Sequence, residues 1–440
     1  MSIKKIIAFG SAKGGVGKSS ITASIGISLS KKYKVGILDA DIYGPNQDIL
    51  FSIDKKPEYT NKSTIKPIKK NNIIGPKAIV HLDRCRKNLL SIQDKVGDKK
   101  LLCVVKANGY GHGAIQIARS ISDIYNVQFA VFSFDEAIEL RDANIKNDIL
   151  IFSKLQSANI DSAYKNNLIL NISSHDDIRN AEYYLKKNKV SPRYHIKFDT
   201  GMTRLGFDLK DAEEVFNKIS GEISSYIEGI YTHFATADEG ELSYAERQLK
   251  DFNKVIKQAD GFGLSFKYIH CSNSGALLNI EKSYFNMVRV GMLLYGALPS
   301  NEVVDNIGIQ PVMSFCGSIV NVRQVKKGTH ISYGGVYKTL TDCNIAVVQT
   351  GFADGFPRPW YEKGYVCYKG NNFKIAGRVC MDQLMVDFGN TLPDLGDDVL
   401  FFGENQMGKI PVEVIANQIH STPYVLLTAI GGRTKHIYIN

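Results

Sequence analysis

Short apolar runs alternate with helix-length segments across residues 101–290. Eight of these runs have the composition of buried strands, with mostly Val, Ile, Leu, Phe or Tyr. They are Leu101–Val105, Phe129–Ser133, Ile149–Phe152, Leu168–Ile172, His195–Phe198, Ile227–Thr232, Tyr268–His270 and Val288–Val290. Eight strands in alternation with helices predict an α/β fold with a TIM (β/α)8 barrel. We assign residues 75–310 to this barrel.

The pattern changes after about Pro311. Apolar runs that alternate with polar residues are separated there by Gly and Asp turns, and few segments have helical periodicity. The clearest runs are Ser314–Val325, Asn344–Thr350, Tyr365–Tyr368 and Gln383–Phe388. Such alternation is typical of antiparallel strands, so residues 311–440 are expected to form a separate, mainly β domain.

The start of the chain is organised differently. Residues 4–41 have the pattern of one βαβ unit, in which a helix beginning at Ser19 lies between two short apolar strands, and we assign residues 1–54 to this fragment. Lys55–Asn72 is rich in Lys and Asn and lacks a hydrophobic period. Residues 55–74 are therefore expected to be a flexible linker.

Composition narrows the class of protein. With 44% hydrophobic and 22% charged residues the chain has a soluble globular composition, and no apolar run is long enough to span a membrane. Residues 1–75 hold 13 lysines against 5 acids, which is most of the net charge of +10, so nucleic acid is not an expected partner. The seven cysteines are scattered without CxxC pairs. This pattern argues against disulfides or a zinc site and fits a reducing cytoplasm.

The most informative stretch is VVKANGYGHG, residues 104–113. It places Lys106 at the end of a predicted strand and ahead of three glycines, and barrel enzymes carry their chemistry at the C-terminal ends of strands. A partly desolvated lysine has a lowered pKa and can form a Schiff base with pyridoxal phosphate. The alternative is a surface lysine in a turn.

The same ten residues closely resemble the pyridoxal-phosphate lysine signature of alanine racemases. The resemblance extends from about Gly75 to the C-terminus, through at least seven motif blocks. It implies a homodimer that uses pyridoxal 5'-phosphate to interconvert L-alanine and D-alanine. The D-alanine would serve peptidoglycan synthesis.

Candidate phosphate ligands follow from the same resemblance. Ser274 in HCSNSG, and Gly291 and Met292 in VRVGM, lie in loops after late barrel strands. Hydroxyl and backbone N–H groups in such loops commonly bind phosphate. By resemblance, Tyr110 and Tyr424 add phenolic donors. Taken singly, each of these residues is also compatible with an ordinary turn.

Arg289, in NMVRVG, matches the arginine that faces the pyridine nitrogen in the family. A guanidinium is effectively always protonated, so it donates to that nitrogen and leaves it unprotonated, which suppresses transamination. The alternative, a surface arginine, fits poorly with the apolar residues on both sides. His233, in YTHFATADE, is either structural or the family residue that links the catalytic tyrosine to Arg289.

The block HIKFDTGMTRLG supplies two more candidates. By resemblance, Arg204 contacts the phenolic oxygen of the cofactor and the substrate carboxylate. Lys197 matches a lysine that is carbamylated in some members, which turns a cation into an anion able to hold Arg204. An unmodified Lys197 paired with Asp199 is the alternative.

Racemisation removes a proton from one face of Cα and returns one to the other, so two bases are expected. Lys106 serves one face, and by resemblance Tyr333 in HISYGGVY serves the other. A phenol has a pKa near ~10, and the His233–Arg289 pair would supply the cationic neighbours that it needs. In the family, the β domain of one subunit caps the barrel of the other. Tyr333 and Met381 would then act in trans, and the Met381 N–H would bind the substrate carboxylate.

Three residues depart from the family pattern. Gly109 replaces the usual alanine, and Thr203 replaces the usual glycine. Phe352 stands where many members have a tyrosine at the active-site entrance. The last change removes a hydroxyl from the entrance and leaves substrate selection open.

The N-terminal fragment carries a separate motif, KGGVGKS, after a strand and before a helix. It has the form of a P-loop, in which backbone N–H groups and a lysine surround phosphates. Its phosphate-binding residues would be Gly14, Gly15, Gly17, Lys18 and Ser19. With Lys13 and the later LDADIYGPN, it resembles the Mrp branch of the ParA/MinD ATPases. No Walker B strand follows, and one βαβ unit buries too little surface to be stable alone, so we interpret the loop as vestigial.

Two rival functions fit parts of the chain. A barrel-type amino-acid decarboxylase is disfavoured by Arg289 and Tyr333. A Mrp/ParA-like nucleotide-binding protein with a passenger barrel is the alternative from another class. A visible absorbance of bound pyridoxal phosphate would separate a pyridoxal-phosphate enzyme from this nucleotide-binding class.

Overall fold

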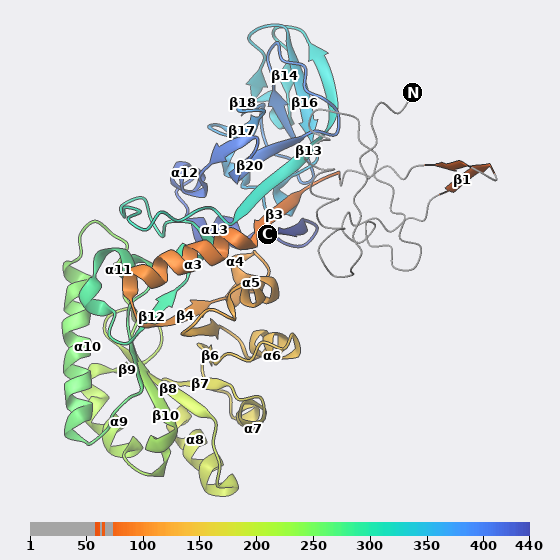
Figure 1. Ribbon diagram of the computed structural model, residues 1–440. Coiled ribbons are helices and arrows are strands. Elements are labelled where there is room, and N and C mark those ends of the chain that lie inside the picture. Colours follow the sequence, from red (N-terminus) through yellow and green to blue (C-terminus); the bar gives the residue numbers. More distant parts are fainter. Residues whose placement is uncertain (1–57, 62–63, 67–73) are drawn as a thin grey trace. The chain divides into compact units, whose positions relative to one another are not determined.

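The computed structural model (Figure 1) describes residues 58–61, 64–66 and 74–440. Contacts divide the chain into two units, 1–73 and 74–440. In the first unit, β1 (Glu58–Asn61) pairs antiparallel with β2 (Thr64–Lys66), within the segment for which we expect a flexible linker. The P-loop and the predicted βαβ unit lie outside the described residues.

Eight parallel strands form the barrel that the sequence predicts. They are β4 (Lys100–Val104), β5 (Val127–Val131), β6 (Ile149–Ile151), β7 (Ile169–Ile172), β8 (Arg193–Asp199), β10 (Ile227–Tyr231), β11 (Tyr268–His270) and β12 (Met287–Val290). Their order is β11-β10-β8-β7-β6-β5-β4-β12, and the short β9 (Phe207–Asp208) pairs with β8. Every residue of β5 and β7 is buried, as expected for parallel strands covered on both faces. The predicted fold class is confirmed.

The barrel is nearly closed between β11 and β12. Within the described residues no strand ladder joins these two strands, but the Arg289 N–H donates to the Ser272 carbonyl at 3.1 Å across the seam. The loop after β11 and the strand β12 are thereby held next to each other. These two segments carry Ser274 and Arg289.

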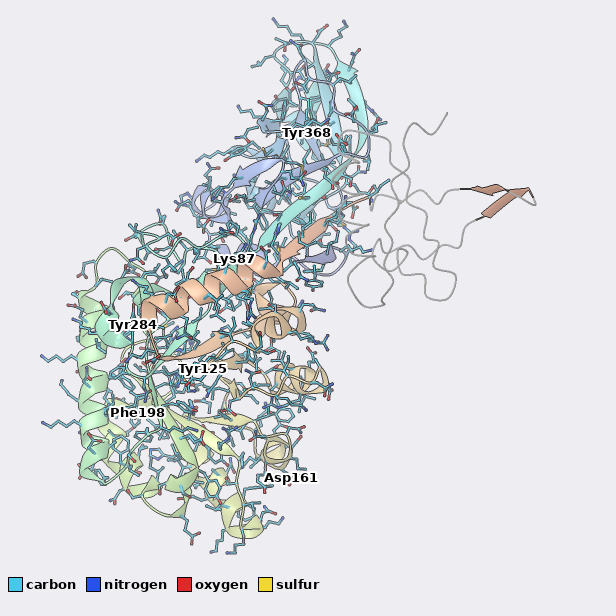
Figure 2. All side chains as sticks on the ribbon, viewed as in Figure 1. Lys87, Tyr125, Asp161, Phe198, Tyr284 and Tyr368 are labelled. Atoms are coloured by element: carbon cyan, nitrogen blue, oxygen red, sulfur yellow. The ribbon has the colours of Figure 1, made fainter. Side chains whose placement is uncertain are left out.

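Helices surround the barrel strands (Figure 1). The helices of this region are α3 (Leu82–Val96), α4 (Lys106–Tyr110), α5 (Ala114–Ile121), α6 (Phe134–Asp142), α7 (Ile160–Lys165), α8 (His175–Asn188), α9 (Ala212–Ile219), α10 (Ser243–Gly261) and α11 (Ser274–Asn279). Phe198 of β8, labelled in Figure 2, packs between strand and helix, with its ring centroid 5.7 Å from that of Phe207 and 5.3 Å from that of Phe216. Across the described part of the chain, every helix is too short or too polar to cross a membrane.

The second sheet has nine strands in the order β21-β20-β17-β18-β19-β16-β13-β3-β22. They are β3 (Lys77–His81), β13 (Met313–Val325), β16 (Cys343–Val348), β17 (Tyr365–Tyr368), β18 (Asn371–Ile375), β19 (Leu384–Asp387), β20 (Asp398–Asn405), β21 (Gly408–Ile410) and β22 (Lys435–Ile439). β13 also pairs with β20, so six of these strands close into a ring. Smaller elements are β14 (His330–Ile331), which pairs with β15 (Tyr337–Lys338), and the helices α12 (Val412–Gln418) and α13 (Pro423–Thr428).

β3 precedes the barrel in sequence but belongs to the second sheet. It pairs antiparallel with β13 and parallel with β22. Lys77 on β3 is buried, and its Nζ lies 2.6 Å from Asp398 Oδ1 on β20 and 3.1 Å from Ser318 Oγ on β13. The second sheet therefore contains chain from both sides of the barrel, and a buried ion pair holds the early strand in place.

Replacing Lys77 with methionine should lower the free energy of unfolding by about 2 kcal/mol, less than for a fully buried pair because the Asp398 side chain is 27% exposed. Urea unfolding followed by circular dichroism measures the change. Lys326→Met is the matched control. Lys326 and Asp342 form a surface pair, 88% and 59% exposed, so its loss should cost less than ~1 kcal/mol. Equal losses in both variants would contradict a special role for the buried pair.

Candidate active site

Lys106 lies just after β4, at the C-terminal end of the barrel, and is half-buried. The residues of the short α4 after Lys106 form a left-handed turn instead of a regular helix. Ala107, Asn108 and Tyr110 have φ of 51°, and Gly109 has φ of 61°. For residues with a Cβ, this conformation costs roughly 1–2 kcal/mol each. Strained backbone of this kind is concentrated at functional sites, so the turn marks Lys106 as a candidate.

One hydrogen bond fixes this turn, and another fixes the end of β4 before it. The Ala107 N–H donates to Glu136 Oε1 at 2.6 Å, and Tyr295 OH donates to the Val104 carbonyl at 2.9 Å. Glu136 also accepts from the Ser133 N–H in the capping box of α6, so one carboxylate joins the turn to the helix. Sequence reasoning missed Glu136, although the capping-box spacing from Ser133 is its signal.

The surroundings of Lys106 favour the neutral amine. Burial lowers the pKa of Lys106, and the positive charge of Arg204 lowers it further, while Glu136 acts in the opposite direction. A lysine with a lowered pKa is a better nucleophile and a usable base near neutral pH.

Ser274, Gly291 and Tyr110 converge on one small space. Ser274 Oγ accepts from the Gly291 N–H at 3.3 Å and from the Leu293 N–H at 3.5 Å. A Cβ on Gly291 would lie 3.2 Å from Tyr110 OH and 3.7 Å from Ser274 Oγ. Hydroxyl and N–H donors that meet in this way suit an anion. The predicted Met292 lies between these two N–H donors, and Leu293 was not predicted.

Tyr424, on α13, lies near the same group. Its ring centroid is 5.8 Å from that of Tyr110, which is 4.9 Å from that of Tyr295. Burial raises the pKa of the Tyr110 phenol and of the Tyr424 phenol. Both phenols therefore remain protonated and can donate hydrogen bonds.

Arg289, on β12, is buried and donates four hydrogen bonds. Its Nη1 donates to His270 Nδ1 at 3.0 Å and to the His270 carbonyl at 3.1 Å. Its Nη2 donates to His233 Nδ1 at 3.0 Å and to the Cys271 carbonyl at 2.9 Å. A guanidinium has five N–H donors. Among the described residues only Nε–H is left without an acceptor, so one donor remains for a ligand.

The partners of Arg289 do not neutralise its charge. Burial lowers the pKa of Arg289 to about 10, which leaves it protonated at neutral pH. Burial lowers the pKa of His233 and of His270 well below the usual range, and the charge of Arg289 adds to both shifts. Both imidazoles are neutral and accept through Nδ1. His270 was not predicted as a site residue, although its position at the end of a predicted strand is a signal.

Lys197, on β8, is buried beside Tyr231. Its Nζ and the Arg289 guanidinium each lie 5.7 Å from the Tyr231 ring centroid. Burial lowers the pKa of Lys197 to about 8, and the charges of Arg204 and Arg289 add to the shift. Asp199 accepts from the Arg204 N–H at 2.9 Å and forms no ion pair with Lys197 in the described structure. Lys197 is therefore a buried amine among cations.

Arg204 is exposed in the loop after β8, next to Thr203, whose φ of 55° favours glycine. Within the described residues its guanidinium donates to no other side chain or carbonyl. Its charge lowers the pKa of Lys106, Lys197 and His233. The C-terminal end of the barrel is thus positively charged and suits an anionic ligand.

Two predicted residues lie apart from this cluster. Tyr333, in a 3-10 turn after β14, is 65% exposed, and Met381, between β18 and β19, is 56% exposed. Neither makes a hydrogen bond or ring contact with Lys106 in the described part of the chain. Ser332 precedes Tyr333 with φ of 67°, and its Oγ donates to the Arg378 carbonyl at 2.6 Å, which fixes the turn. A single chain therefore leaves Tyr333 at the surface.

Comparison with known proteins identifies the family. Residues 80–299 match the family model described as alanine racemase, N-terminal domain, and residues 312–438 match alanine racemase, C-terminal domain. Residues 2–80 match a model described as NUBPL iron-transfer P-loop NTPase. The alanine racemase of Desulforamulus reducens is 36% identical over 368 residues, which cover 82% of this chain and 98% of that protein. That of Clostridium tetani is 34% identical over 369 residues, which cover 82% and 95%.

Solved structures agree with these matches. The alanine racemase of Streptomyces lavendulae has a TM-score of 0.79 at 29% identity, covering 84% of this chain and 98% of that one. The alanine racemase of Bacillus anthracis with bound L-Ala-P has a TM-score of 0.76 at 31% identity, covering 84% and 96%. Together with the barrel, the β domain and the cluster around Lys106, these matches show that the chain belongs to the alanine racemase family of isomerases, with a segment similar to P-loop NTPases at its start.

Proposed function

We propose that this enzyme interconverts L-alanine and D-alanine with pyridoxal 5'-phosphate as its cofactor, and so supplies D-alanine for peptidoglycan. The observation that carries the proposal is the placement of Lys106, Ser274 and Arg289. They lie at or just after the C-terminal ends of β4, β11 and β12, which meet where the barrel closes. Barrel enzymes place their chemistry at this end of the strands.

The groups present fit this cofactor. Ser274, Gly291 and Tyr110 would bind the phosphate, Arg289 Nε–H would donate to the pyridine nitrogen, and Lys106 Nζ would bind the aldehyde. When bound, pyridoxal phosphate withdraws electrons from the substrate and makes its Cα proton acidic. Because Arg289 can only donate, it would leave the pyridine nitrogen unprotonated. The weaker electron withdrawal would favour return of the proton to Cα over transamination.

We infer that two bases act on opposite faces of Cα. Lys106 Nζ takes or returns the proton on one face, because its lowered pKa makes the neutral amine accessible. Tyr333 of the partner subunit serves the other face, since one chain leaves this phenol exposed. His233 accepts from Arg289 through Nδ1, so its Nε2–H is left to donate to the phenol oxygen. That hydrogen bond would stabilise the Tyr333 phenolate, which is the form that acts as a base.

The substrate carboxylate is assigned to Arg204 and to the backbone N–H of Met381 of the partner subunit. The Arg204 guanidinium donates to no other described residue, and it lies close enough to Lys106 to lower the pKa of that amine. An anion bound there would be held beside the base. Two chains would then share each active site, so the functional unit is proposed to be a homodimer.

Lys197 is proposed to carry a carbamate. The ammonium group first loses one proton. The neutral amine then attacks CO2, the N–C bond forms and a second proton leaves, so the side chain changes from a cation to an anion. Neutral amine is available because the pKa of Lys197 is lowered to about 8. The charges of Arg204 and Arg289, which repel an ammonium group, would attract the carbamate.

The N-terminal segment is proposed to be a truncated P-loop fragment, residues 1–54, joined by residues 55–74 to a racemase that occupies the rest of the chain. The family match over residues 2–80 supports this ancestry. The P-loop itself lies outside the described residues. We propose a cytoplasmic location and no role for this segment in racemisation.

Lys106→Ala should abolish cofactor attachment and lower racemisation at least about 1000-fold, because both the anchoring amine and one base are lost. Borohydride reduction of wild-type protein followed by peptide mapping should place the pyridoxyl group on Lys106. Lys100→Ala, at the opposite end of the same strand, is the control and should keep the label and the activity. A label on another lysine, or racemisation by Lys106→Ala, would refute the assignment.

Mixing Lys106→Ala subunits with Tyr333→Phe subunits should restore activity. If Tyr333 acts across the interface, each hybrid dimer has one intact site, and a random mixture should regain about a quarter of the wild-type rate. Chiral chromatography of alanine measures the rate. Both parents must fold, dimerise and be inactive alone. A mixture that forms hybrids and stays inactive would place Tyr333 and Lys106 of one chain in the same site.

Incubation with isotopically labelled bicarbonate should label Lys197. Because the pKa of Lys197 is lowered to about 8, neutral amine increases as pH rises through 8, and at fixed dissolved CO2 the label should increase with it. Carbon NMR of the intact protein measures the carbamate. The signal should be absent from Lys197→Met. An unchanged signal in that variant would show that another amine reacts.

A further inference from the structure

A chain of hydrogen bonds continues from Arg289 into the interior of the barrel. Arg289 Nη1 donates to His270 Nδ1 at 3.0 Å, and His270 Nε2 lies 2.9 Å from His195 Nδ1. All three side chains are buried, and they come from β12, β11 and β8. His195 thus lies one residue beyond direct contact with the arginine, in a part of the barrel that the proposed chemistry does not otherwise use.

The direction of these bonds follows from the arginine. A guanidinium can only donate, so His270 Nδ1 must accept, and a neutral His270 then carries its proton on Nε2. That proton points to His195, which accepts through Nδ1 and carries its own proton on Nε2. Burial lowers the pKa of His195 to about 3, and the charge of Arg193 contributes, so this ring is neutral as well. In residues 74–440 no side chain or backbone group accepts from His195 Nε2, so the order is set at the Arg289 end.

His195 therefore stabilises the tautomer of His270 that Arg289 requires, because it accepts the proton on Nε2. If the acceptor at His195 were lost, His270 Nε2–H would be a buried donor without a partner. A change of tautomer would relieve this, but it would place an N–H opposite Arg289 Nη1. The guanidinium would then lose a hydrogen bond that fixes its plane, and with it the direction of Nε–H.

We propose that His195 is a positioning residue for racemisation, because it orients Arg289 through His270. This inference rests on the proposed function, in which Arg289 Nε–H keeps the pyridine nitrogen unprotonated. His195 has no contact with the reacting atoms. Its effect is on the outcome of the reaction, since a misdirected guanidinium would let the ring nitrogen gain a proton.

A second feature holds His195 in place. Gly229 on β10 packs against the face of the imidazole, and a Cβ built there would lie 2.6 Å from His195 Cγ. Only glycine fits at this distance without moving the ring. Gly229→Ala would therefore displace His195 while leaving every polar group in the chain intact, which gives an independent way to disturb the same hydrogen bond.

The test measures the ratio of transamination to racemisation in the cofactor-loaded enzyme. In the side reaction, alanine and pyridoxal phosphate become pyruvate and pyridoxamine phosphate. His195→Leu removes the acceptor, so pyruvate formed per racemisation event should rise about tenfold, and the visible absorption of the bound cofactor should change. His195→Asn can offer an amide oxygen where Nδ1 was, so it should restore both readouts toward wild type. Pyruvate is followed with lactate dehydrogenase and racemisation by chiral chromatography.

Two further variants keep the result decisive. His81→Leu is the control for losing a buried imidazole and should leave the ratio unchanged. Within residues 74–440 the imidazole of His81, on β3, has Ser314 Oγ at 3.1 Å as its one hydrogen-bond partner. Gly229→Ala should raise the amount of pyruvate formed per racemisation event, as His195→Leu does. It provides the test if His195→Leu does not fold. Racemisation and pyruvate formation that fall together, with an unchanged ratio and spectrum, would overturn the proposal. If wild-type enzyme neither binds pyridoxal phosphate nor racemises alanine, the proposed function itself has failed.

Discussion

The solvation of one buried cation determines how this active site is built. Arg289 lies inside the barrel, and its terminal N–H groups go to two imidazoles and two backbone carbonyls. Moving a charge out of water costs several kcal/mol unless polar groups replace the hydration. Neutral acceptors do this without cancelling the charge. The fifth N–H therefore stays a cationic donor, whereas a carboxylate partner would have weakened it.

Among the described residues, other cationic side chains of the site also lack a carboxylate ion-pair partner. Burial lowers the pKa of Lys106 and of Lys197, and repulsion by the charge of Arg204 lowers both further. The turn after Lys106 adds backbone strain, because its residues with a Cβ are left-handed. A phosphate and a carboxylate bound from outside would relieve the repulsion. Ligands that bind only the folded state stabilise it, so a site built in this way is completed by its ligands.

Sequence patterns predicted the barrel well and individual contacts poorly. All eight barrel strands lie within two residues of their predicted bounds, because buried parallel strands are short apolar runs between turns. β3 could not be placed, because its partner β13 lies more than 200 residues away and no local pattern records that pairing. β20 was missed because pairing with β13 and β17 buries it, so its apolar residues are continuous rather than alternating. Glu136 and His270 were missed because their contacts with the Ala107 N–H and with Arg289 join separate elements. The capping-box spacing marks Glu136 only as part of α6.

The predicted role of Tyr333 differs from that of the barrel residues because it depends on a second chain. Lys106, Ser274 and Arg289 are brought together by neighbouring strands of one barrel, so their geometry is a property of a single chain. Tyr333 and Met381 lie in exposed turns of the C-terminal domain, and only in the proposed dimer would they face the barrel of a partner subunit. The left-handed Ser332 and its bond to the Arg378 carbonyl fix the turn of Tyr333 within a single chain. In the proposed dimer each chain would contribute one part of the site, and association would supply the second base.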